Sequence, residues 1–214
     1  MRLQAFGLLA LLAAPLAAQD RASGTYVVER AGSEIGSEQF TLEPGARDRS
    51  GTTLTVSSRY PGAPRGGTVA SRLERTADGQ LSLFQLDVEG DEGQTTILAA
   101  GAGARVILRT KARGSEAGRE VPGGPNVVLL DENAYTLYIA VADLATVEGA
   151  RITAIFPRTG RRAQLLAKRD GNADGPARIT LSGEISGTLT VDATGRPARM
   201  EFAGSGVTVR LADR

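Results

Sequence analysis

The chain has 214 residues, with 25 Lys and Arg against 24 Asp and Glu, and it contains neither Cys nor His. Without these two residue types, Ser-His-acid and Cys-His catalysis, thiolate and His-ligated metal sites and disulfide bonds are excluded. The near balance of charges gives no reason to expect nucleic acid or an anionic membrane as a partner. An enzyme of this composition would depend on a carboxylate pair, a Lys or Tyr base, or a metal held by oxygen atoms.

The first 18 residues have the pattern of a secretory signal peptide. Arg2 precedes an apolar run from about Ala5 to Ala18, which is shorter than the roughly 20 apolar residues of a membrane-spanning helix. We therefore predict cleavage near Ala18, a periplasmic or secreted bacterial protein, and a single β-rich domain over residues 19–214 with no transmembrane segment. Without a Cys at the cleavage point, lipid cannot be attached there as it is in a bacterial lipoprotein.

Short apolar segments alternate with turns along most of the remaining chain. About thirteen of them have strand character, and Asp78-Gly79 between two such segments is a strong hairpin signal. In ARVILRTK (104–111), Val106 and Leu108 share one face while Arg105 and Arg109 share the other. The pattern predicts a mainly β protein with one large curved antiparallel sheet, a half-barrel or open barrel, apolar on one face only.

One segment has helical periodicity instead. After a Gly- and Pro-rich stretch at residues 113–125, which we interpret as a lid or a plain connection, apolar residues recur at the spacing of one helix face. We predict a helix near 133–146 that covers the apolar face of the sheet. Asp131 or Asn133 is expected to cap its start, although Asp131, Glu132 and Asn133 together would also suit a polar site.

Three acidic residues offer a candidate catalytic group. Asp87, Glu89 and Asp91 are two positions apart and would line one face of a strand, where paired carboxylates could serve glycoside hydrolysis. The scarcity of aromatic residues and the lack of Trp argue against stacking of sugar rings. A solvated strand end is the favoured interpretation, so we assign no catalytic residue.

The segment DGNADG (170–175) resembles the beginning of an EF-hand loop, with Asp170, Asn172 and Asp174 at alternate positions. The twelfth position of such a loop requires Glu, but Leu181 stands there, and the flanking segments have strand character. We therefore predict a turn and assign no metal site, with weak calcium binding left as an alternative.

Basic residues gather at Arg158, Arg161 and Arg162, followed by Lys168 and Arg169. A phosphate or anionic head-group contact is one interpretation. A solvated hairpin whose charges deter edge pairing is the other, and it is favoured.

The overall layout resembles the LolA/LppX-type half-barrels of the bacterial envelope: a signal peptide, a many-stranded antiparallel sheet, and a helix that enters midway after a Gly/Pro loop. The segments GSEIGSEQF (32–40) and VDATGRPARMEF (191–202) also resemble the start and the closing hairpin of uncharacterised secreted β-rich domains. LolA/LppX proteins hold acyl chains between a concave sheet and covering helices, so the resemblance implies a lipid site. The chain departs from that family in lacking the anchoring Cys and in having less helix.

From these observations we predict a non-enzymatic envelope protein, without a cofactor, that binds or carries an apolar ligand such as a lipid between sheet and helix. The predicted ligand-binding residues are Leu137, Tyr138, Val141 and Leu144, although the same residues would also suit a dry core. One alternative is a structural or assembly module that binds another envelope protein through an exposed strand edge. A carboxylate-based enzyme is the remaining alternative.

Overall fold

The computed structural model describes residues 22–45, 51–61, 67–90, 93–171, 176–193 and 195–212. The predicted signal peptide and its cleavage near Ala18 lie outside these ranges, and so do Asp91, Asn172 and Asp174. Within the described ranges, no helix is long and apolar enough to cross a membrane.

The described strands form one sheet of fifteen. Their bounds are β1 (Ala22–Arg30), β2 (Ser33–Pro44), β3 (Thr52–Arg59), β4 (Thr68–Arg75), β5 (Leu81–Gly90), β6 (Gly93–Ala102), β7 (Arg105–Ala112), β8 (Ser115–Pro122), β9 (Val127–Leu129), β10 (Ala150–Ile155), β11 (Arg162–Asp170), β12 (Ala177–Gly183), β13 (Gly187–Val191), β14 (Pro197–Phe202) and β15 (Val207–Leu211). The spatial order runs from β8 down to β1, then from β15 down to β9. Neighbouring strands are antiparallel except β9 and β10, which are parallel.

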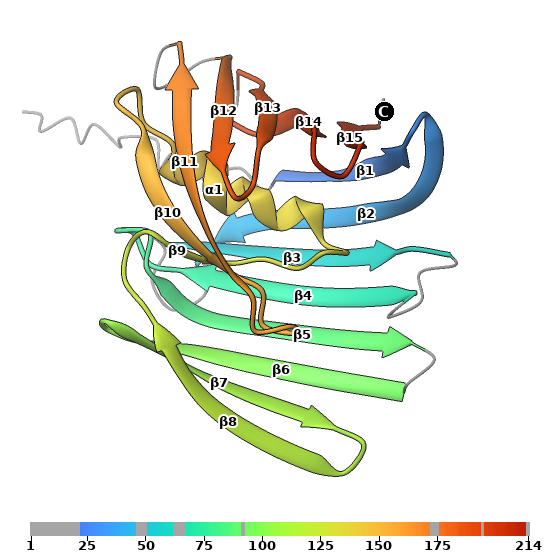
Figure 1. The fold of residues 1–214 in the computed structure, drawn as a ribbon, viewed down its shortest axis with the longest axis vertical. Helices are drawn as coiled ribbons and strands as arrows, with labels where there is room; N and C mark the ends of the chain where they lie inside the picture. Colours follow the sequence, from blue (N-terminus) through green and yellow to red (C-terminus); the bar gives the residue numbers. More distant parts are fainter. Residues whose placement is uncertain are drawn as a thin grey trace, which may run out of the picture.

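The sheet curls until it is nearly closed into a barrel, with β8 and β9 as its two edges. In Figure 1, β1–β8 run across the view while β10–β13 cross their direction above them. Side chains alternate as expected: Val106 and Leu108 are buried inside, while Arg105 and Arg109 are exposed outside. The predicted fold class is confirmed. The alternation gives the sheet one apolar face, and the sheet buries this face by curling around it.

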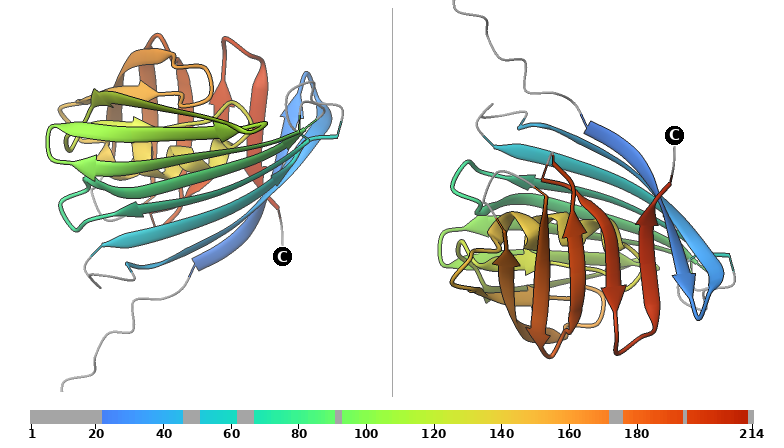
Figure 2. Two further views of the ribbon diagram at one scale, coloured as in Figure 1. Left: turned by 90° about the horizontal axis from the view of Figure 1, so that it is seen from below. Right: turned by 90° about the horizontal axis from the view of Figure 1, so that it is seen from above.

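Helical structure in the described residues consists of a 3₁₀ turn, η1 (Tyr135–Tyr138), that continues into a short α-helix, α1 (Ile139–Leu144). Both views of Figure 2 place it between the two halves of the sheet. Element η1 contacts β2 and β3, and α1 contacts β10 and β11. The helix therefore fills the interior of the curled sheet and is covered on both sides.

The predicted helix near 133–146 is shorter in the structure. It begins after Ala134 and ends at Leu144, because Ala145 is extended with φ −68° and ψ 130°. The apolar run before it, which includes Val127 and Leu129, forms strand β9 and pairs with β10.

The lid or loop predicted at residues 113–125 is wrong for most of its length. Residues Ser115–Pro122 form strand β8, which pairs with β7 along its whole length. Pro122 stands at the last position of this edge strand, where the missing N–H costs no bond inside the sheet. Apart from Val121, β8 is exposed, so the sequence lacks the apolar alternation by which strands are recognised.

Candidate ligand-binding clefts

Two clefts open beside the polar turn that joins β9 to η1. The first has a volume of about 700 Å³, and the second about 490 Å³. They share one wall, formed by Arg30, Asp131, Glu132, Asn133 and Phe156. The turn at 131–133 therefore separates two adjoining spaces.

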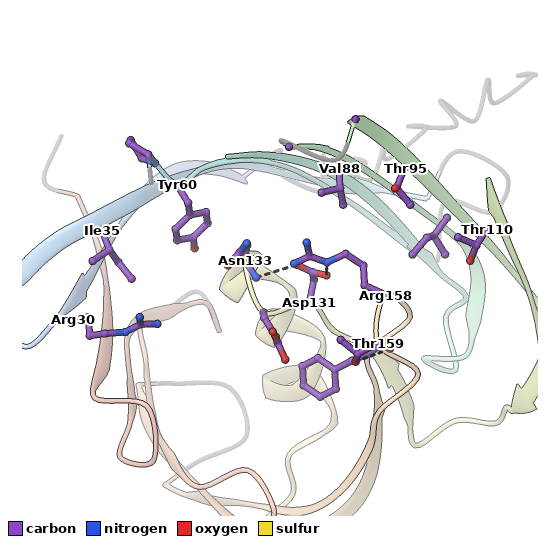
Figure 3. Close-up of a pocket in the computed structure, with 16 residues that line it drawn as sticks. Arg30, Ile35, Tyr60, Val88, Thr95, Thr110, Asp131, Asn133, Arg158 and Thr159 are labelled. Carbon is purple, nitrogen blue, oxygen red and sulfur yellow. Dashed lines mark hydrogen bonds and ion pairs between the residues drawn. The ribbon is translucent and has the colours of Figure 1, made fainter. Parts of the chain in front are cut away.

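The first cleft has an apolar and a polar wall, as Figure 3 shows. The concave face of the sheet supplies Ile35, Val88 and Ile97. Opposite them lie Asn133 and the pair Asp131–Arg158. Such a combination of apolar surface with few convergent polar groups is typical of small-molecule sites.

Arg158 and Asp131 form a two-point ion pair in this wall. Arg158 Nε lies 2.6 Å from Asp131 Oδ2, and Nη2 lies 2.7 Å from Oδ1. The Asp131 side chain is almost completely buried, and burial raises its pKa while Arg158 opposes the rise. Asp131 Oδ1 also accepts the Asn133 N–H at 2.9 Å, which fixes the turn.

Asp131 and Asn133 do not cap the helix, contrary to expectation, since no side chain from this segment caps η1. Glu38 of β2 accepts the N–H groups of Tyr135 at 2.7 Å and Thr136 at 2.6 Å instead. The hydroxyls of Thr136 and Tyr60 also donate to Glu38. Glu38 is fully buried, and burial raises its pKa.

Arg75 of β4 holds the other end of the helical segment. Its Nη1 donates to the Ala140 carbonyl at 3.2 Å and lies 3.7 Å from Asp143. Its Nε and Nη2 donate to the Gly79 carbonyl in the predicted Asp78-Gly79 hairpin, where Gly79 has φ +76°. An acid at the start and a base toward the end match the charges of the helix dipole.

The second cleft has aromatic walls. The Tyr135 and Tyr138 rings lie 5.3 and 4.7 Å from the Phe202 ring, centroid to centroid. The Arg161 guanidinium lies 3.8 Å from the centroid of Phe156. Five of the eight aromatic residues that follow Phe6 line one cleft or the other, so this scarce residue type concentrates here.

The four residues predicted to bind ligand lie mostly in the core. Leu137 and Val141 are fully buried and line neither cleft. Tyr138 lines the second cleft, and half-buried Leu144 packs near the turn at Gly79. A ligand role for the four stays a prediction, whereas a packing role is visible for each.

The other candidate residues are dispersed. Asp87 and Glu89 lie on the outer face of β5, opposite the face from which Val88 enters the first cleft. Asp170 ends β11, while the rest of its candidate calcium set lies outside the described residues. The parts of the chain that the structure describes contain no group of three acids placed to hold a metal ion.

The basic cluster predicted at residues 158–169 is not one surface. Arg158 lines the first cleft and Arg161 the second. Arg162 and Lys168 are exposed on β11, and Arg169 is buried. The turn between β10 and β11 therefore directs two of the five toward the clefts.

Sequence reasoning missed Glu38 and Arg75. Their contacts with the helical segment span 98 and 65 residues, respectively, so no local pattern reveals them. The polar run at 131–133 does give a signal, since it interrupts an apolar stretch, but the same residue types also predict a helix cap.

No protein-family model matches the sequence, and no curated protein matches it significantly. A solved structure of a DUF1089 family protein from Pseudomonas aeruginosa aligns with 96% of this chain and 98% of its own, at 15% identity and a TM-score of 0.45. The LolA/LppX assignment is not confirmed; the structure supports its coarser part, a large sheet nearly closed into a barrel.

Proposed function

We propose that this chain is an exported protein of the bacterial envelope that binds an amphipathic small molecule, such as a lipid, without transforming it. The first cleft carries the proposal. Its volume of about 700 Å³ lies within the usual range for small-molecule sites, and its apolar sheet wall faces a polar wall. The apolar part of the ligand would lie against Ile35 and Val88.

The test combines native mass spectrometry of protein purified from its own host with uptake of a fluorescent fatty acid. Ile35→Ser removes apolar contact from the cleft at a half-buried position, so we expect about threefold to tenfold weaker uptake. Ile107→Ser on the outer face is the matched control and should bind normally. Absence of both co-purified lipid and fatty-acid uptake would overturn the proposal.

A second candidate, an assembly module, has support from the edge strand β8. None of the described strands pairs with its outer side, so its peptide groups are open to strand addition. Ile107 on the adjacent strand β7 and Leu98 on the next strand, β6, are each 45% exposed. A photo-cross-linker at position 116 in the host should then capture one discrete partner, unlike a probe at Arg151; a partnerless monomer would contradict this candidate.

A further inference from the structure

The charged residues that line the second cleft divide into two groups. Asp131 belongs to the two-point ion pair with Arg158 and is neutralised by it. Arg30, Glu132, Arg161 and Glu184 also line this cleft. Among the residues the structure describes, none of these four takes part in an ion pair.

Neutral groups hold three of these four side chains. Arg30 hydrogen-bonds the Tyr135 side chain, and Arg161 stacks on Phe156. Glu184 Oε1 accepts the backbone N–H of Gln164 at 2.8 Å. Each side chain is thus positioned without having its charge cancelled, which leaves two cationic and two anionic groups around one cleft of about 490 Å³.

This arrangement selects for ligand charge. A purely anionic ligand would lie beside Glu132 and Glu184, and a neutral ligand would gain no charge–charge contact with any of the four exposed side chains. A zwitterion satisfies both signs, because guanidinium groups bind phosphate oxygens and carboxylates accept an ammonium group. The aromatic walls of Tyr135 and Phe202 would in addition suit the cationic end.

We propose that the second cleft binds a zwitterionic head group of the phosphoethanolamine or phosphocholine class, while the first cleft holds the apolar chain of the same molecule. One ligand can extend over both clefts because they lie side by side, with a common wall formed by the turn at 131–133 together with Arg30 and Phe156. The placement of the ligand's apolar chain in the first cleft rests on the proposed function, but the charge selectivity of the second cleft is testable on its own.

The experiment compares lysophospholipids with one acyl chain and different head groups, each below its micelle concentration, by displacement of the fluorescent fatty acid. We expect the zwitterionic phosphoethanolamine form to bind about tenfold more tightly than the anionic phosphoglycerol form and about a hundredfold more tightly than the neutral monoacylglycerol, since each satisfied charge adds roughly one factor of ten. In a separate arm of the experiment, calorimetry measures the binding of free phosphoethanolamine.

Two variants test which residue of the second cleft binds which charge of the ligand. Glu184→Gln should weaken binding of the zwitterionic ligand about threefold to tenfold without weakening binding of the anionic ligand. The amide oxygen of the new Gln side chain can still accept the hydrogen bond from the Gln164 N–H. Arg161→Gln should weaken both, and neither variant should change monoacylglycerol binding. Glu148→Gln and Arg151→Gln, exposed positions outside both clefts, are the matched controls.

The outcomes separate the two proposals. Equal affinity for all three head groups, or equal effects of the cleft and control variants, would overturn the head-group inference and leave the proposed function standing. If free phosphoethanolamine binds but none of the lipids does, the zwitterion site is supported and the lipid-binding function is overturned. No binding in any arm would overturn both.

Discussion

Glu38 shows how one buried carboxyl group can determine the position of a distant segment. Its two oxygens accept two backbone N–H groups and two hydroxyls, so a side chain on β2 supplies the start of η1 with the acceptors that a local cap would give. Because Tyr60 also lines the first cleft, the same network fixes part of the cleft wall.

We predict that Glu38→Gln destabilises the fold by about 1–3 kcal/mol, because the amide nitrogen cannot accept hydrogen bonds and leaves buried donors without partners. Chemical denaturation followed by circular dichroism measures the change. Glu34→Gln, at an exposed position of the same strand, should change stability by less than about 0.5 kcal/mol. Equal midpoints for the two variants would show that the network contributes nothing.

The pH dependence of stability gives a second test of Glu38. Burial raises its pKa in the folded state above the value of about 4.3 expected in the unfolded chain. The folded state therefore keeps the Glu38 proton up to a higher pH than the unfolded chain does. The stabilisation of the fold that results is fully present below about pH 4.3 and is lost as the pH rises through the folded pKa. The stability advantage of the wild type over Glu38→Gln should shrink as the pH rises above about 4.3, the pKa of the unfolded chain; an advantage that grows would contradict this assignment.

At the scale of elements, α1 has too few residues to be stable alone, since isolated helices shorter than about 12 residues are marginal in water. Its position depends on Glu38 before it, on Arg75 toward its end, and on apolar side chains such as Leu137 packed between the two halves of the sheet. The helix is therefore stabilised by its contacts with the curled sheet.

We predict that Leu137→Ala costs about 2–5 kcal/mol of stability, because it leaves a cavity at a fully buried position. Leu144→Ala should cost less, since Leu144 is only half buried. Ligand affinity of the folded protein should not change in either variant, because neither residue lines a cleft. Thermal unfolding and the fatty-acid assay measure the two effects, and lost affinity in a folded Leu137→Ala protein would restore the ligand role predicted from the sequence.

At the scale of the whole molecule, the sheet is not sealed by backbone pairing between its edge strands. Arg119 of β8 crosses this seam and donates to the Pro157 carbonyl at 2.6 Å, in the turn that also carries Arg158 and Arg161. Its neighbour in the ladder, Leu108, faces the interior, so the Arg119 side chain lies on the inner side. A single side chain thus links one edge of the sheet to the walls of both clefts.

We predict that Arg119→Ala accelerates amide hydrogen exchange in residues 156–161 about fivefold to tenfold, as loss of one hydrogen bond of about 1–1.5 kcal/mol would produce. Exchange followed by mass spectrometry measures it, with Arg109→Ala on the outer face as control. Unchanged exchange in the Arg119 variant would mean that the turn is held by its other contacts, such as its own backbone hydrogen bonds and the Arg158–Asp131 pair.

Much of the architecture was open to prediction from local pattern. The alternation in β7, the Asp78-Gly79 hairpin and the closing hairpin near 191–202 are short-range features, and the structure contains all three. Strand β8 was not predictable, because an exposed edge strand carries no alternation. The helical segment at 135–144 lies inside the predicted range near 133–146 and is a few residues shorter.

The sequence by itself determined the absence of thiol and imidazole chemistry and the formation of a large sheet with one apolar face, because these follow from composition and from a period of two along each strand. Only the tertiary structure decided that Glu38 and Arg75 hold the helical segment, that Asp131 pairs with Arg158, and that two clefts adjoin at the turn between β9 and η1. These contacts join residues up to 98 positions apart, and their geometry depends on how far the sheet curls.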